Sequence, residues 1–222
     1  EVCSLYDIFN AFSISAISFF DFITMPDGCI AIVVGDVIGH GIGAALIMAE
    51  VRAFLRAFTK MYKDPAKILT LLNKELIADL QEDQFITLIL AKLDPRERSL
   101  VYASAGHVPA FILNRSGKID YTMDSTGFPL GFLKDYKIEN SEPIKLTPDN
   151  MAVFFTDGIM EAQSPDGKEF GLDRILNIVN CEQKATAQQI VESIYKEVRF
   201  FSENQPQEDD ITSVIFKVNS TS

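Results

Sequence analysis

Strands and helices occupy separate blocks along this chain, and their order constrains the fold more than any other feature. Turn sequences such as Asp94-Pro95 and Ser116-Gly117 join consecutive strands as hairpins. Hairpins produce antiparallel pairing, whereas a doubly wound parallel sheet needs a helix after each strand. The order therefore favours an α+β fold, with helices packed outside one or two mostly antiparallel sheets.

The spacing of apolar residues sets the expected elements. Continuous or alternating apolar runs predict strands over residues 12–23, 29–35, 85–92, 100–105, 109–114, 151–156 and 211–218. Apolar stripes at helical spacing predict helices over residues 44–62, 65–80, 172–179 and 187–200. Hydrophobic residues make up 47% of the 222 residues, which is enough for a sizeable core, so we expect a single domain over 1–222.

Three aspartates share one context at the ends of buried strands. Asp36 follows the apolar run IAIVVG, Asp157 follows MAVFFT, and Asp209 precedes ITSVIF. The end of one strand and the start of an antiparallel neighbour lie at the same sheet edge, so these carboxylates could converge. Oxygen ligands in such a cluster favour Mg²⁺ or Mn²⁺ over Zn²⁺. Aspartate is also a common turn and capping residue, and spacing alone leaves both interpretations open.

Two other kinds of site fit the sequence less well. Gly39, Gly41 and Gly43 lie between a strand and a helix, but their spacing differs from the dinucleotide-binding G-x-G-x-x-G. No G-x-S-x-G elbow is present, and Ser104 near His107 is weak support for nucleophilic catalysis. His107 and His40, each beside glycines, could act as a general acid near a metal or could hold a tight turn through backbone hydrogen bonds.

Charge and cysteine content limit the partners and the compartment. The net charge of −11 disfavours nucleic acid and an anionic membrane surface as main partners. Three cysteines without a CxxC pair fit a reducing cytoplasm, and no apolar run is long enough for a spanning helix. We therefore expect a cytoplasmic domain with no membrane contact of its own. Because the chain lacks an initiator Met, we expect it to be a fragment of a longer protein, which could be membrane-attached through other segments.

Five segments, in order along the chain, resemble the motifs of one protein family. They are GDVIGHGIGAALIMA (35–49), YASAGHVPAFIL (102–113), GFPLGF (127–132), FFTDGIMEA (154–162) and EDDITSVIF (208–216). They are similar to the motifs of bacterial phosphatases of the SpoIIE and RsbU type, within the PPM or PP2C-like superfamily. Each segment alone is weak, but the ordered set is specific.

The resemblance implies an αββα sandwich with two central antiparallel sheets and a site for two Mn²⁺ or Mg²⁺ ions. Asp36 would bridge both ions, the Val37 carbonyl would join the first, and Asp157 and Asp209 would bind the second. A water acidified by the ions would attack the phosphorus of phosphoserine or phosphothreonine in line. The implied substrate is a phosphorylated anti-sigma-factor antagonist, and such phosphatases are often regulated by dimerisation, which allows a homodimer here.

One position departs from the family pattern. The family usually has Gly-Gly-Asp before an aromatic pair, whereas this chain has Ala16-Ile17-Ser18. A neutral hydroxyl at position 18 should weaken the hold on the first metal. Asp21, three residues on, should face the other side of the strand and so should not replace the missing carboxylate. The alternative to an active enzyme is therefore a pseudophosphatase that serves as a binding module.

Overall fold

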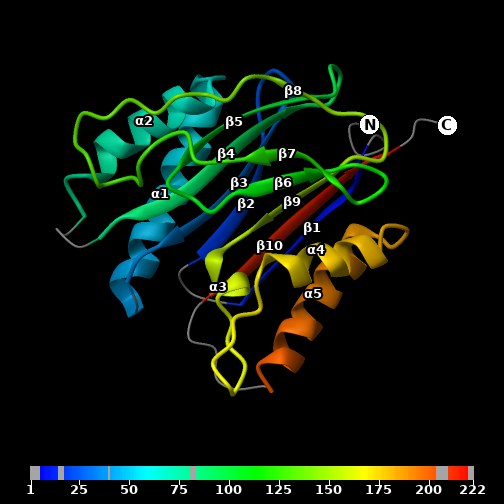
Figure 1. Cartoon of the computed structure of the whole chain (residues 1–222). Helices are drawn as coiled ribbons and strands as arrows, with labels where there is room; N and C mark the ends of the chain where they lie inside the picture. The colour runs from blue at the N-terminus through cyan, green and yellow to red at the C-terminus, as the bar shows by residue number, and fades with distance from the viewer. Residues whose placement is uncertain (1–5, 15–17, 40, 81–83, 204–209, 220–222) are drawn as a thin grey trace. The chain divides into compact units, whose positions relative to one another are not determined.

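The computed structural model describes residues 6–14, 18–39, 41–80, 84–203 and 210–219. These residues form two compact units, each built around a five-stranded sheet in which every pairing is antiparallel (Figure 1). The predicted α+β class with mostly antiparallel sheets is therefore confirmed. The prediction of a single domain over 1–222 stays a prediction.

One unit comprises residues 16–109 and 124–146, and the order of the strands in its sheet is β2-β3-β4-β5-β8. Apolar residues recur about once per turn along both of its helices, which buries one face of each helix. Asp64 caps the second helix by accepting a hydrogen bond from Lys67 N–H, and Pro65 occupies the first turn. The elements are β2 (Ser18–Thr24), β3 (Ile30–Val37), α1 (Gly41–Met61), α2 (Pro65–Leu76), β4 (Ile86–Asp94), β5 (Ser99–Ala105) and β8 (Ile144–Lys145).

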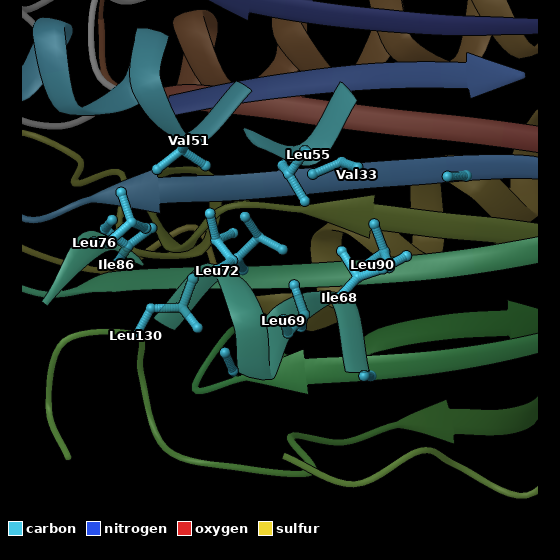
Figure 2. Packing of buried hydrophobic residues seen from close by; sticks show 14 of the residues in the cluster. Val33, Val51, Leu55, Ile68, Leu69, Leu72, Leu76, Ile86, Leu90 and Leu130 are labelled. Atoms are coloured by element: carbon cyan, nitrogen blue, oxygen red, sulfur yellow. The ribbon is translucent and has the colours of Figure 1, made fainter. Parts of the chain in front are cut away.

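The core of this unit lies between its sheet and its two helices. Figure 2 shows side chains from α1, α2 and the strands pointing toward one another. Leu69, Leu72 and Leu76 of α2 and Leu55 of α1 are fully buried in this cluster. This packing anchors both helices to the sheet, and α1 is the helix that follows the strand carrying Asp36.

The other unit comprises residues 1–15, 110–123 and 147–222, with strand order β1-β10-β9-β6-β7. The central strands β9 and β10 are almost wholly buried, as their continuous apolar sequences predict. α5 packs on β1 and β10, and α4 packs on α5. The elements are β1 (Tyr6–Ile14), β6 (Ala110–Leu113), β7 (Ile119–Met123), β9 (Met151–Phe155), α3 (Asp157–Met160), α4 (Leu172–Cys181), α5 (Ala187–Phe201) and β10 (Ile211–Val218).

Some elements differ from the sequence-based expectation. α2 ends at Leu76 rather than near residue 80, because the chain turns there with Asp79 N–H donating to Leu76 O. Three short elements were not predicted: β7, β8 and α3. Four of the five residues of β7 are exposed, and the other two elements have only two and four residues, so none has a distinct apolar pattern.

Candidate metal site

Asp157 lies where β9 ends, beside the start of β10. Thr156 N–H donates to Thr212 O over 3.0 Å, which continues the pairing of the two strands by one residue. Asp157 begins the one-turn helix α3, and its carboxylate accepts the Gly158 N–H at 3.1 Å. The carboxylate is thus held at the end of a buried strand, as the sequence predicted.

The Thr156 side chain fastens the start of β10 to the end of β9. Its Oγ1 donates to the carbonyl of Asp210 at 2.9 Å and accepts the Thr212 N–H at 3.0 Å. Thr156 and Thr212 are both fully buried, so the bond between them forms away from water, whereas Asp210 is half-buried. We call this pair of bonds the Thr156 clamp. It holds the backbone of Asp210 beside the end of β9, where Asp157 follows; Asp209 lies outside the described residues.

Asp36 lies near the end of β3 in the other unit, within a row of polar residues. Ser18 of β2 is directly opposite Asp36 on one side, and Thr87 of β4 is directly opposite on the other. Directly paired residues of an antiparallel sheet point to the same face, with Cβ atoms about 5 Å apart. Ser18, the residue that stands in the family's acidic position, is therefore an immediate neighbour of Asp36. Val37 is buried, and the metal-binding role predicted for its carbonyl stays a prediction.

His107 joins this row through Thr87. Its Nδ1 lies 3.0 Å from Thr87 Oγ1, within hydrogen-bonding distance. His107 is only 4% exposed and Ser104 is fully buried, so Ser104 is not accessible as a nucleophile. His40, the other candidate, lies outside the described residues.

Asp21 faces the helices, on the other side of the sheet from Ser18. Its carboxylate accepts hydrogen bonds from Arg52 and Arg56 of α1. The sequence-based prediction that Asp21 points away from position 18 is confirmed. It does not supply the missing carboxylate.

The structure distributes the predicted carboxylates over two sheets rather than along one edge. Asp157 and Asp210 belong to one unit, and Asp36 belongs to the other. Among the described residues, no group of three His, Cys, Asp or Glu side chains could hold a metal ion. The convergence of Asp36, Asp157 and Asp209 stays a prediction.

Sequence reasoning missed Thr156 and Thr87, the two residues whose hydroxyl groups organise the surroundings of the aspartates. A signal was present for Thr156, since a threonine flanks each of the two strand ends that carry the second and third aspartates. No pattern in the sequence marks Thr87, because its role depends on which strand pairs with β3.

The chemistry of the donor atoms fits a hard divalent cation. Asp36, Asp157 and Asp210 are half-buried carboxylates at strand ends. An all-oxygen donor set favours Mg²⁺ or Mn²⁺.

Comparison with known proteins identifies the family. The model of the family "Stage II sporulation protein E (SpoIIE)" matches residues 26–219, which is most of the chain. The chain belongs to the SpoIIE family. The resemblance predicted from the five motifs is therefore confirmed.

Two relatives show how far the sequence similarity reaches. Protein IcfG of Synechocystis sp. is 32% identical over 130 residues, which cover 59% of this chain and 20% of IcfG. The phosphoserine phosphatase RsbU of Bacillus subtilis is 28% identical over 155 residues, covering 69% of this chain and 45% of RsbU. The chain thus spans less than half the length of either relative.

The solved structures share the fold. The PP2C phosphatase domain of Bacillus subtilis SpoIIE, solved with a fragment of its regulatory domain, has a TM-score of 0.81 at 19% identity, covering 95% of this chain and 62% of that one. The SiaA-PP2C domain of Pseudomonas aeruginosa has a TM-score of 0.80 at 21% identity, covering 94% and 85%. The chain therefore has the PP2C fold. Within its described part, no helix combines the length and apolar character that crossing a membrane requires.

Proposed function

We propose that this SpoIIE-family chain is a metal-dependent protein phosphatase acting on phosphoserine or phosphothreonine. The observation that supports the proposal is the Thr156 clamp, which links the end of β9, just before Asp157, to Asp210 and Thr212 at the start of β10. These two hydrogen bonds bring a second acidic residue, Asp210, to the strand end that carries Asp157. Such an arrangement brings like charges together, and a bound cation relieves their repulsion.

Two Mn²⁺ or Mg²⁺ ions are the proposed cofactors. Asp36, the Val37 carbonyl, Asp157 and Asp209 would hold them, as the family resemblance implies. When bound, the ions would acidify a water for in-line attack on phosphorus and offset charge on the phosphoryl oxygens. The chain's part is to keep hard oxygen ligands at fixed positions, and the buried strands β3, β9 and β10 provide that rigidity.

The proposed substrate is a phosphorylated regulatory protein of the anti-sigma-factor antagonist type, in the cytoplasm. RsbU is named a phosphoserine phosphatase, and a structure with RsbU and RsbW domains from Mycobacterium tuberculosis shares the fold at a TM-score of 0.78. The net charge of −11 disfavours a nucleic-acid partner. A homodimer is the proposed assembly, by analogy with the family.

Hydrolysis of a phosphoserine peptide across a Mn²⁺ titration tests the proposal. Activity should rise with Mn²⁺, disappear with chelator, and be lost in Asp157→Asn. A matched control is Asp149→Asn, which removes a carboxylate at the opposite end of the same strand pair, where Asp149 N–H bonds to Val218 O. Asp149 has a φ of 68°, a conformation that asparagine tolerates well. Hydrolysis that persists in Asp157→Asn and in chelator would refute the proposal.

A pseudophosphatase is the second candidate, and the position of Ser18 favours it. Ser18 is 3% exposed and directly opposite Asp36, so a carboxylate is missing from the immediate neighbourhood of a proposed bridging ligand. Loss of such a supporting group typically costs 10- to 100-fold in metal affinity. The chain would then fold and bind a partner with little turnover.

The substitution Ser18→Asp separates the two candidates. For a degraded site, the added carboxylate should tighten Mn²⁺ binding by roughly 10- to 100-fold and raise turnover. Ser18→Asn, which has a similar size but no charge, is the control. Strong activity in the unmodified chain, with no gain in Ser18→Asp, would rule out the pseudophosphatase.

A further inference from the structure

Asp21 binds two arginines on successive turns of α1. Arg56 approaches it with two nitrogens, Nε at 2.7 Å from Oδ2 and Nη2 at 2.9 Å from Oδ1, while Arg52 Nε lies 3.2 Å from Oδ2. Asp21 is 5% exposed, and its Oδ1 also accepts the Phe22 N–H at 3.0 Å. The carboxylate is thus saturated by donors from its own strand and from the helix above it.

The charged form of Asp21 is the stable one in this setting. Burial acts to raise the pKa of Asp21, but the hydrogen bonds from Arg56 and Arg52 outweigh it and place the pKa below its usual value. A bidentate arginine–carboxylate pair is stronger and more directional than a neutral hydrogen bond. The contact therefore fixes geometry as well as contributing attraction.

The remaining contacts of α1 are less able to set its position. Its buried residues are Ala44, Ile47, Val51, Leu55 and Thr59, about one per turn along a single stripe. Apolar burial is non-directional, so it holds the helix on the sheet without strictly fixing its rotation or its position along its axis. Near the helix start, Ala44 and Ile47 are the buried anchors, while Ile42 and Leu46 are 81% and 65% exposed.

α1 follows the candidate metal ligands closely in the chain. Only three residues separate Val37 at the end of β3 from Gly41 at the start of α1. Because this connection is short, we expect a shift of the helix along its axis to be transmitted to the backbone at Asp36 and Val37. We propose that Asp21 is a positioning residue: through Arg52 and Arg56 it sets the place of α1 and so holds Asp36 and Val37 in the geometry that binds metal. The link to metal rests on the proposed function.

The chain offers a matched control in Asp27. Asp27 pairs with Lys92 at 3.0 Å and with Lys63 at 3.8 Å, and it accepts the Cys29 N–H at 3.2 Å. It lies in the turn between β2 and β3, at the opposite end of the hairpin from the Ser18–Asp36 pair. Asp27→Asn therefore removes a comparable ion pair from the same hairpin without touching α1 near the arginine contact.

Three measurements on Asp21→Asn and Asp27→Asn test the inference: the melting temperature, the Mn²⁺ dissociation constant measured with the metal alone, and amide hydrogen exchange in the first two turns of α1. Asp21→Asn should weaken Mn²⁺ binding by about 10-fold and speed exchange at the start of α1. Asp27→Asn should lower the melting temperature about as much as Asp21→Asn does. It should leave the Mn²⁺ dissociation constant and the exchange rates in α1 close to those of the unmodified chain. Arg56→Lys keeps the positive charge but cannot hold the Asp21 carboxylate through two nitrogens, so it should also weaken Mn²⁺ binding, as Asp21→Asn does.

Equal effects of Asp21→Asn and Asp27→Asn on Mn²⁺ binding and exchange would overturn the inference, because both pairs would then be merely structural. The inference would also be overturned if amide hydrogen exchange at the start of α1 were as slow in Asp21→Asn as in the unmodified chain. The exchange measurement needs no metal, so failure of the proposed function is recognised separately: the unmodified chain would then neither bind Mn²⁺ nor hydrolyse the peptide.

Discussion

Replacing Thr156 by valine should loosen the candidate metal site while preserving the shape of its core. Valine keeps the branched side chain but removes the hydroxyl that donates to Asp210 O and accepts from Thr212 N–H. Both bonds lie at a fully buried threonine, and valine offers no substitute for either. The start of β10, from Asp210 to Thr212, would lose its side-chain link to β9.

The expected cost follows from the two groups left without this partner. A buried polar group that loses its hydrogen bond costs about 1–3 kcal/mol, and the Asp210 carbonyl is only half-buried, so water can compensate part of its loss. We expect Thr156→Val to lower the free energy of unfolding by about 2–3 kcal/mol. At a urea dependence of about 2–3 kcal/mol per molar, the unfolding midpoint would fall by about 1 M.

Urea unfolding and a Mn²⁺ titration, run on the same preparations, check this prediction. Thr59→Val is the control: Thr59 is 1% exposed, but its hydroxyl donates to Leu55 O, a carbonyl inside α1 that also belongs to the helix hydrogen-bond ladder. In Thr59→Val the free energy of unfolding should fall by less than about 1 kcal/mol, and Mn²⁺ should bind as tightly as to the unmodified chain. If Thr156→Val is no less stable than Thr59→Val, or binds Mn²⁺ as tightly, the clamp does not organise the site.

Two further predictions concern stability. Leu72→Ala, at a fully buried position of α2 in the cluster of Figure 2, should lower the free energy of unfolding by about 3 kcal/mol because it leaves a cavity, and a loss below about 1 kcal/mol in urea unfolding would contradict this. Asp27 has a pKa of about 2, because hydrogen bonds from Lys92 and Cys29 N–H outweigh the opposing effect of burial. Its stabilising contribution is complete above pH ~4 and disappears as the pH falls toward 2, so the stability gap between the unmodified chain and Asp27→Asn should shrink over that range. A gap that stays constant from pH 5 to pH 2 would show that the Asp27 charge contributes nothing.

Much of the fold could be predicted because its main elements have strong local patterns. The strand predicted over 211–218 has those bounds in the structure, and the helix predicted over 44–62 is α1, Gly41–Met61. Long apolar runs and helical stripes are determined by the residues of the element itself. β7 had no such pattern, because pairing with β6 rather than its own burial makes it a strand.

The candidate site was predictable in part. The place of Asp157 after a buried strand was predicted from the apolar run before it, and the family was predicted from motifs that occur in a fixed order. Thr87 could not be found, since its position opposite Asp36 depends on the register of β3 with β4. Pairing register is a property of two strands together and leaves no mark on either sequence alone.

The sequence by itself determined the fold class, the family and the positions of Asp36 and Asp157 at strand ends, because apolar periodicity and ordered motifs are local properties of the chain. Only the tertiary structure decided that Asp21 binds arginines 31 and 35 residues away and that Thr156 clamps a segment 54 residues further on. These contacts require strands and helices to be placed to within a fraction of an ångström, because hydrogen bonds weaken steeply with distance and angle. That precision comes from packing the whole unit.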